Sequence, residues 1–386
     1  MKSWVLVSFL VLFPGFLPRA SAQWVPDPDF DFHVQKGIDY TNNLEFEKAN
    51  VEFAELVKMK SDHPAGHFFL AMVDWWRILL DLDDDSHDGE FFDKLGNVID
   101  MCNTRLDKDE NDITALFFKG GAIGFRGRLH ANRNHWIRAA NDGRRALGIV
   151  QKAYELQPNN YDILLGTGIY NYYAEVAPER YPLLKPLMWF LPKGDKAKGI
   201  EQLHLASQHA KYAKIEATYF LMQLYFYFEK DYVAALKLAT ELHKGYPNNS
   251  LFHRYLGRAY VTLNRLNEAH GVFTEVLKRH NESQVGYNKA AAREAYYYIG
   301  LYRLSVGQLE EALSQFSFSE RLSREIDKGT PSGYMVMAIL RMGMAFDLSK
   351  KREDAIQSYK RVLALNEFED SHKLAKQYLE KPYGGN

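Results

Sequence analysis

The densest group of side chains that could bind an anion lies between Arg126 and Arg145. Six arginines and two histidines fall within these twenty residues, and Trp136 lies among them. Guanidinium groups match the geometry of carboxylates and phosphates, and an indole ring can stack on one of them. The alternative is a solvated helix face whose arginines pair with Asp142 and Glu155. The candidate anion-binding residues are Arg126, Arg128, Arg133 and Arg138.

Two other groups have the residue types of a metal site but not its pattern. The acidic stretch Asp81–Asp88 begins like a calcium loop, but its sixth position is Ser86 instead of glycine and its twelfth is Phe92 instead of glutamate. His63 and His67 are four residues apart, as on one helix face, but no third ligand can be named for zinc. We therefore predict no metal site and no cofactor.

The sequence contains no arrangement typical of a catalytic site. There is no phosphate-binding loop, no Gly-x-Ser-x-Gly elbow and no His-Glu-x-x-His motif. The single cysteine, Cys102, lacks a motif and is expected to be a small buried hydrophobe. We predict a protein without catalytic residues that is not an enzyme. An enzyme that uses Arg133 and Arg138 against an anionic substrate remains an alternative.

The segment Pro178–Gly199 is too rich in proline for one helix and too apolar for an ordinary loop. We expect it either to fill the groove of its own fold or to present an apolar surface to a partner or a membrane. Three lysines follow its apolar part and would suit an anionic headgroup layer. The candidate contact residues in this segment are Leu187, Trp189 and Phe190.

Tyrosines cluster on both sides of this segment, and such rings give rigid contact area with one polar end. The alternative is packing between helices, which we favour for Tyr298 and Tyr302. Outside the proline-rich segment, the candidate partner-binding residues are Tyr170, Tyr173, His253 and Tyr296.

The elements that must position these residues are indicated by a repeat. Three glycines lie 43 residues apart; an alanine follows each glycine by twelve residues, and an aromatic residue follows each alanine by four. Small residues let two antiparallel helices approach closely, and the aromatic ring fills the adjacent groove. The three sets are Gly257, Ala269 and Phe273; Gly300, Ala312 and Phe316; and Gly343, Ala355 and Tyr359.

The same spacing recurs near the N-terminus at Gly37, Ala49 and Phe53, and Gly120 aligns with the repeat glycine. Since a fixed repeat indicates a solenoid, we predict about seven to eight helix pairs and no strands. The clearest pairs are expected at 215–246, 250–280, 290–324 and 334–365. Less regular helices are expected at 65–81, 89–106, 112–125, 134–156, 160–176 and 196–210.

The first 22 residues have the features of a cleaved secretory signal peptide. Lys2 is followed by an apolar run from Trp4 to Phe16, and Ala20-Ser21-Ala22 is a small-x-small cleavage site. We therefore expect an exported protein, periplasmic or extracellular if its source is bacterial. Without Lys2 and Arg19 the chain has 46 basic and 49 acidic side chains, so nucleic-acid binding is not expected.

The predicted organisation has five parts. Residues 1–22 are a signal peptide and 23–32 an N-terminal lead. Residues 33–210 form a divergent helical region with an insertion at 178–199. Residues 211–366 form regular repeats, and 367–386 form a capping helix and tail.

The three C-terminal repeats resemble tetratricopeptide repeats in the positions of their glycine, alanine and aromatic residues. The standard repeat has about 34 residues, so the 43-residue spacing implies longer helices or connections. The resemblance implies an all-α, right-handed helical solenoid of antiparallel helix pairs, whose concave groove takes extended peptides or helices.

The middle of the chain is similar to the tetratricopeptide repeat protein 39 and inclusion-clearance family. The matching stretches are Leu165–Tyr170 and Gly194–Ile200, about 40 residues with the segment between them. This resemblance implies a link to the mitochondrial outer membrane or to lipids, and it transfers no catalytic residues. A cleaved secretory signal departs from that family and puts a shared location in doubt.

These features predict an exported, non-enzymatic scaffold that binds a protein or peptide segment in its concave groove. The alternative is a membrane-peripheral or lipid-associated helical module that uses the Pro178–Gly199 segment.

Overall fold

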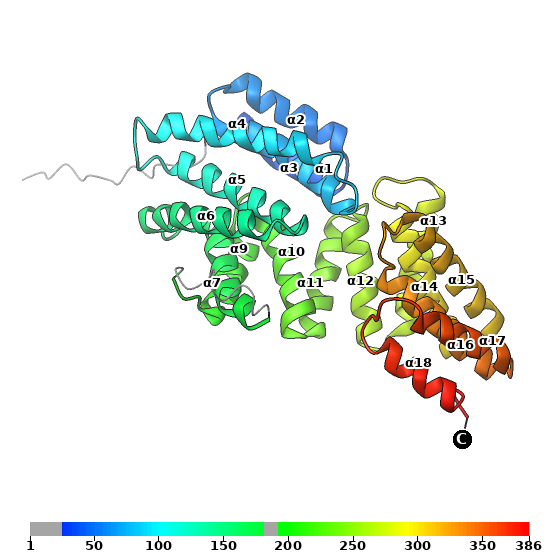
Figure 1. The fold of residues 1–386 in the computed structure, drawn as a ribbon. Helices are drawn as coiled ribbons and strands as arrows, with labels where there is room; N and C mark the ends of the chain where they lie inside the picture. Colours follow the sequence, from blue (N-terminus) through cyan, green and yellow to red (C-terminus); the bar gives the residue numbers. More distant parts are fainter. Residues whose placement is uncertain (1–24, 181–191, 386) are drawn as a thin grey trace, which may run out of the picture.

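The chain folds into a succession of paired helices (Figure 1). The computed structural model describes residues 25–180 and 192–385, and within these ranges it contains no strand. Eight helix pairs follow one another and a single helix, α18 (Ser371–Glu380), covers the last pair. The pairs are α1 (Pro28–Asn42) with α2 (Phe46–Met59), α3 (Pro64–Leu80) with α4 (Asp88–Leu106), α5 (Ile113–Asn132) with α6 (Trp136–Leu156), α7 (Ile163–Arg180) with α9 (Lys196–His209), α10 (Lys214–Leu224) with α11 (Tyr232–Gly245), α12 (Ser250–Thr262) with α13 (Leu266–Asn281), α14 (Lys289–Ser305) with α15 (Leu309–Ile326), and α16 (Gly333–Leu348) with α17 (Arg352–Leu363).

Below, the first helix of each pair is called helix A and the second helix B. The prediction of an all-α, tetratricopeptide-like solenoid is confirmed, because each helix packs mainly on its neighbours in the chain. Such a stack buries the apolar face that no single pair can bury alone. No helix in the described part of the chain is both long and apolar enough to cross a membrane.

The repeat glycines lie where helix A touches the aromatic ring of helix B. A Cβ atom placed on Gly257 would be 2.6 Å from the ring of Phe273, closer than two carbon atoms can approach. The same contact recurs between Gly37 and Phe53, Gly300 and Phe316, and Gly343 and Tyr359. The predicted small–small–large pattern therefore describes how these four pairs are packed.

The turn between helix A and helix B marks the register of each repeat. In four pairs a residue with positive φ follows the repeat glycine by seven positions, as Asn264 follows Gly257. Asn134 has the same conformation and lies seven residues after Gly127, which approaches Asp142 of α6. The alignment of Gly120 with the repeat glycine was therefore wrong, because α5 continues twelve residues beyond Gly120, whereas α12 ends five residues after Gly257. The positive-φ turn residues of this kind are Leu44, Asn134, Lys230, Asn264, Gly307 and Lys350.

The observed element boundaries differ most from the sequence pattern at α1 and α5. Helix α1 begins at Pro28, within the expected lead, because the Asp27 carboxylate accepts hydrogen bonds from the backbone of Asp29 and Phe30 and caps the helix. Helix α5 extends to Asn132, seven residues beyond the predicted end at residue 125, so the arginine-rich stretch begins inside a helix.

The first helix pairs fold back onto helices that come some two hundred residues later. Trp76 of α3 lies between Tyr219 of α10 and Phe252 of α12, with ring centroids 5.8 and 5.5 Å away. The Asn249 side chain donates to the Asn42 carbonyl group at 2.8 Å. The N-terminal pairs therefore cover one edge of α10, α12 and α14, as Figure 1 shows.

Candidate binding surface

The helix-A side of the central repeats carries a network of arginines and tyrosines around one buried carboxylate. Arg254 and Arg258 are one helical turn apart on α12 and so share a face. Both reach Glu294 of α14, through Nη2 of Arg254 at 2.6 Å and Nε of Arg258 at 2.5 Å. Burial alone would raise the pKa of Glu294, but the two guanidinium groups outweigh it and lower the pKa to about 2. The carboxylate thus remains charged and holds both arginines in place.

Tyr227 extends this network toward solvent. It lies on η2 (Tyr225–Glu229), a π-helical turn that follows α10 and ends at Lys230 in the left-handed conformation. The Tyr227 residue is 40% exposed, and its hydroxyl group lies 3.3 Å from both Nη1 of Arg258 and the hydroxyl group of Tyr255. Tyr227 is therefore an exposed ring whose polar end is already bonded.

Arg128 of α5 anchors the other end of the network. Its guanidinium group lies 4.9 Å from the Trp75 ring centroid and 4.4 Å from that of Phe220. It also donates to Glu216 at 3.2 Å and to Gln223 at 3.4 Å. The Gln223 amide in turn donates to the Tyr255 hydroxyl group at 3.0 Å, which connects Arg128 to the tyrosines on α12.

Together these residues define what we call the inner-face patch. It spans five helix-A or turn segments and ends at Tyr298 and Tyr334, whose rings meet edge to face at 6.1 Å. Three guanidinium groups face two carboxylates, those of Glu216 and Glu294, and burial raises the pKa of Glu216 despite Arg128. The patch therefore has an excess of positive charge. Its members are Arg128, Tyr227, Arg254, Arg258, Tyr298 and Tyr334.

The four arginines expected to form an anion site do not share one: three of them have separate partners. Arg126 forms a two-point contact with Asp142, at 2.7 and 2.6 Å, and Arg133 binds Asp88 at 2.7 Å. Arg128 belongs to the inner-face patch. Arg138 is exposed on α6 and makes no hydrogen bond or ion pair with the described residues. The structure brings none of the four to a common carboxylate.

The expected partner-binding residues are scattered over the structure. The Tyr170 hydroxyl group donates to the Pro192 carbonyl group, and Tyr173 packs edge to face on Phe228 at 5.5 Å. Tyr296 is half-buried and stacks on Phe318 at 5.1 Å. Leu187, Trp189 and Phe190 lie outside the described residues.

His253 lies in the core between α12 and its neighbours. It is 3% exposed, stacks on His243 at 4.3 Å and bonds to the Tyr287 hydroxyl group at 3.2 Å. Burial lowers its pKa to about 3, so the ring is neutral. A partner could reach this side chain only if the surrounding helices moved apart.

The sequence pattern did not identify Tyr227, Arg254, Arg258 or Glu294 as site residues. One signal was available, because Arg258 directly follows repeat glycine Gly257, as Arg128 follows Gly127. The residue after the repeat glycine lies about 100° around helix A from the face that contacts helix B. If Gly127 instead of Gly120 had been aligned with Gly257, the sequence would have placed Arg128 and Arg258 on the same face of their helices.

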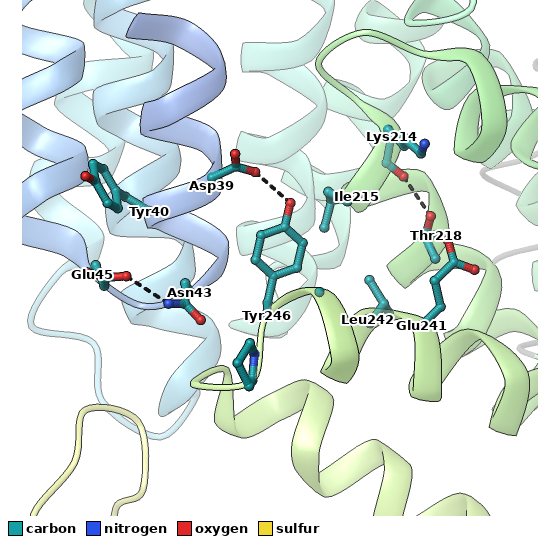
Figure 2. A pocket seen from close by; sticks show the side chains of 12 residues that line it. Asp39, Tyr40, Asn43, Glu45, Lys214, Ile215, Thr218, Glu241, Leu242 and Tyr246 are labelled. Carbon is teal, nitrogen blue, oxygen red and sulfur yellow. Dashed lines mark hydrogen bonds between the residues drawn. The ribbon is translucent and has the colours of Figure 1, made fainter. Parts of the chain in front are cut away.

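A separate cleft of about 520 Å³ lies where α1 meets α10 and α11 (Figure 2). The rings of Tyr40 and Tyr246 and the apolar side chains of Ile215 and Leu242 form much of its lining. The Tyr246 hydroxyl group donates to Asp39 at 2.8 Å. The remaining lining residues are Asn43, Glu45, Lys214, Thr218, Glu241, Gly245 and Pro247.

The remaining candidates from the sequence, His63 and Cys102, are buried in the packed interior of the fold. His63 is buried and accepts a hydrogen bond from the Ala65 backbone, so it caps α3. Cys102 is buried in the core. Within residues 25–180 and 192–385, no group of three histidine, cysteine or acidic side chains could hold a metal ion.

No family model and no curated protein matches the chain. Among solved structures, it is similar to yeast Tom70, with 12% identity, 91% of this chain and 88% of the other covered, and a TM-score of 0.38. It is also similar to human IFIT1, solved as a dimer with PPP-AAAA, with 12% identity, 83% and 68% covered, and a TM-score of 0.44. A tetratricopeptide repeat protein from Parabacteroides merdae matches with 11% identity, 86% and 100% covered, and a TM-score of 0.34.

Proposed function

We propose that this protein is a non-enzymatic scaffold that binds a polypeptide segment on the inner-face patch. The observation that carries the proposal is the Arg254–Glu294–Arg258 cluster beside exposed Tyr227. Internal hydrogen bonds hold these side chains before any partner arrives, which reduces the entropy lost on binding. Tyrosine and arginine are the residue types that most often dominate binding energy at protein interfaces.

The charge of the patch favours a client segment with acidic residues. Three guanidinium groups outnumber two carboxylates, and Tyr227, whose hydroxyl group lies 3.3 Å from Nη1 of Arg258, is the exposed member. In such a client segment, an acidic side chain would accept hydrogen bonds from a guanidinium group, and an adjacent apolar side chain would pack on a tyrosine ring. Salt should therefore weaken binding to this patch.

Site-specific photo-crosslinking tests this proposal. A benzophenone amino acid at Tyr227 should capture a discrete protein in the native host. The same substitution at Tyr161, which is 39% exposed on a distant surface, is the matched control because Tyr227 is 40% exposed. The captured client should then bind purified Tyr227→Ala at least tenfold more weakly than the wild type. Equal capture at both positions, or equal affinity, would remove the patch from the function.

One observation favours a second candidate function, peripheral binding to an anionic membrane. Trp136 and Ile137 are adjacent on the first turn of α6 and are 49% and 78% exposed. Exposed Arg138 and Arg144 follow on the same helix and make no ion pair with the described residues. A tryptophan with neighbouring arginines suits a membrane interface. The apolar segment Pro178–Gly199 could add to such a contact.

Flotation with vesicles of phosphatidylglycerol and phosphatidylcholine tests the membrane candidate. Wild-type protein should float and Trp136→Ser with Ile137→Ser should not. Tyr161→Ser is the control for an exposed aromatic residue elsewhere. If the wild type stays at the bottom of the gradient at low salt, the membrane candidate is removed.

We further propose that the chain is exported after cleavage behind Ala22. The basis is the sequence of residues 1–22, which lie outside the described part of the chain. Mass spectrometry of the protein from its native host should find Gln23 as the first residue. A mature chain that retains Met1 or Lys2 would contradict cleavage.

A further inference from the structure

The cleft between α1 and α10–α11 has the dimensions of a ligand site and lies outside the inner-face patch. Its volume of about 520 Å³ falls in the range of roughly 300–1,000 Å³ that is typical of sites for small ligands. Ile215 and Leu242 give it apolar surface, and aromatic and charged side chains surround them (Figure 2). The cleft has walls from two distant parts of the chain, since Asp39 and Tyr246 are 207 residues apart.

Tyr246 is held in a defined orientation within this cleft. Its hydroxyl group donates to Oδ1 of Asp39 at 2.8 Å, as the dashed line in Figure 2 shows. Burial, together with this bond to Asp39, raises the pKa of Tyr246, so the hydroxyl group stays a neutral donor. The ring is therefore a fixed surface beside a carboxylate.

The charges that line the cleft are unequal. Three carboxylates, from Asp39, Glu45 and Glu241, accompany one ammonium group, from Lys214. The Glu45 carboxylate forms an ion pair with Lys48 and accepts a hydrogen bond from the Asn43 amide. Glu241 is exposed and has no hydrogen bond or ion pair with the part of the chain that the structure describes. The unmatched charge of the cleft is therefore negative and centred on Glu241 and Asp39.

We propose that this cleft binds the guanidinium group of an arginine side chain presented by a peptide. A guanidinium group is planar, stacks on an aromatic ring and donates to carboxylates in a fork, so it matches a tyrosine ring beside two acidic groups. Among the described residues these carboxylates do not form a group that could hold a metal ion, which favours a larger organic cation. The apolar surface of Ile215 and Leu242 would take the methylene groups of the side chain.

This inference does not depend on the proposed function, because the cleft and the inner-face patch have no residue in common. A client of the patch could place an arginine here, or a different peptide could do so. The test therefore uses small defined peptides and needs no client.

The ligand pair acetyl-Leu-Arg-Leu-amide and acetyl-Leu-citrulline-Leu-amide isolates the guanidinium charge. Citrulline has nearly the same shape as arginine but no positive charge. Methyl-labelled protein would be titrated with each peptide, and the NMR signals of Ile215 and Leu242 would report binding inside the cleft. The arginine peptide should shift these signals at concentrations at least fivefold lower than the citrulline peptide needs. Equal effects of the two peptides, or no shift with either, would overturn the proposal.

Two variants at exposed positions should change the affinity in opposite directions. Glu241→Gln removes the open carboxylate and should weaken binding of the arginine peptide roughly threefold to tenfold. Lys214→Ala removes the one cation among the described residues that line the cleft, and should tighten binding of the arginine peptide roughly twofold to fivefold. Glu310→Gln, on the exposed surface of α15, is the control and should leave the affinity unchanged. If Glu241→Gln binds as the wild type does, the assignment of the cleft is wrong.

Discussion

The side-chain nitrogen of Asn249 lies 2.8 Å from the carbonyl oxygen of Asn42, a residue 207 positions earlier in the chain. Asn249 uses its oxygen to cap α12, through the backbone of Leu251 and Phe252, and its nitrogen to bind the end of α1. One repeat further on, Asn288 caps α14 and donates to Leu80 at the end of α3. The A helices of the first two repeats, α1 and α3, thus end on the N-terminal caps of two later A helices, α12 and α14.

The bridge from Asn249 should contribute to stability separately from its cap. Asn249→Ser keeps an oxygen that can cap α12 but cannot reach Asn42, and we expect a loss of about 1 kcal/mol in the free energy of unfolding. Asn249→Ala loses both interactions and should cost about 2–3 kcal/mol. Urea unfolding measures both. A serine variant as stable as the wild type would show that the bridge adds nothing.

Neutralising Glu294 should be far more harmful than neutralising a surface glutamate. Glu294 has no exposed side-chain area and holds Arg254 and Arg258, so Glu294→Gln leaves two guanidinium groups without their counter-charge. We expect a loss of about 3–5 kcal/mol. Glu268→Gln breaks the exposed pair with Arg265 and should leave the free energy of unfolding close to that of the wild type. Similar shifts in the urea midpoint for both variants would contradict a buried network.

Gly257→Ala should destabilise the protein although alanine favours helices. Its Cβ would lie 2.6 Å from the Phe273 ring, and the overpacking should cost about 1–3 kcal/mol. Gly271→Ala, on α13, is the matched control because its Cβ would meet nothing within 4 Å. That variant should gain roughly 0.5–1 kcal/mol from helix propensity. Thermal unfolding of the pair separates the two effects, and a stable Gly257→Ala would refute the packing contact.

Acid should destabilise the fold through buried neutral histidines. Burial lowers the pKa of His63 to about 4 and that of His253 to about 3, against an ordinary value of 6.5. The unfolded chain therefore binds more protons between these values, so the stability that is present above pH 6.5 is lost as pH falls toward 4. Each histidine should contribute a slope of about 1.4 kcal/mol per pH unit in that window.

His63→Asn provides the test of this assignment. Asparagine can still cap α3 but does not titrate, so the pH dependence of unfolding between pH 6 and 4.5 should become shallower by about one proton. Urea unfolding at several pH values measures the slope. An unchanged slope would mean that His63 is not a source of the acid sensitivity.

The sequence by itself determined the helix pairs, because the residues that pack them are close in the chain. Gly257 and Phe273 are 16 residues apart and meet across one turn, so their spacing is visible without any structure. The middle of the chain was harder to align with the glycine–alanine–aromatic repeat. There Gly143 takes the place that Phe273 has in its repeat, so no aromatic residue marked the pair of Gly127.

Only the tertiary structure decided which helix-A side chains meet across repeats. The approach of Asn249 to Asn42, and of Tyr246 to Asp39, depends on the summed curvature of the first five helix pairs, which local spacing does not encode. That closure built the cleft at the seam, whereas the inner-face patch came from contacts between neighbouring helix-A segments such as Arg258 and Glu294. The repeat pattern in the sequence shows which residues make contact within a helix pair. Each pair is rotated slightly relative to the pair before it, and the sum of these rotations determines which distant pairs come into contact.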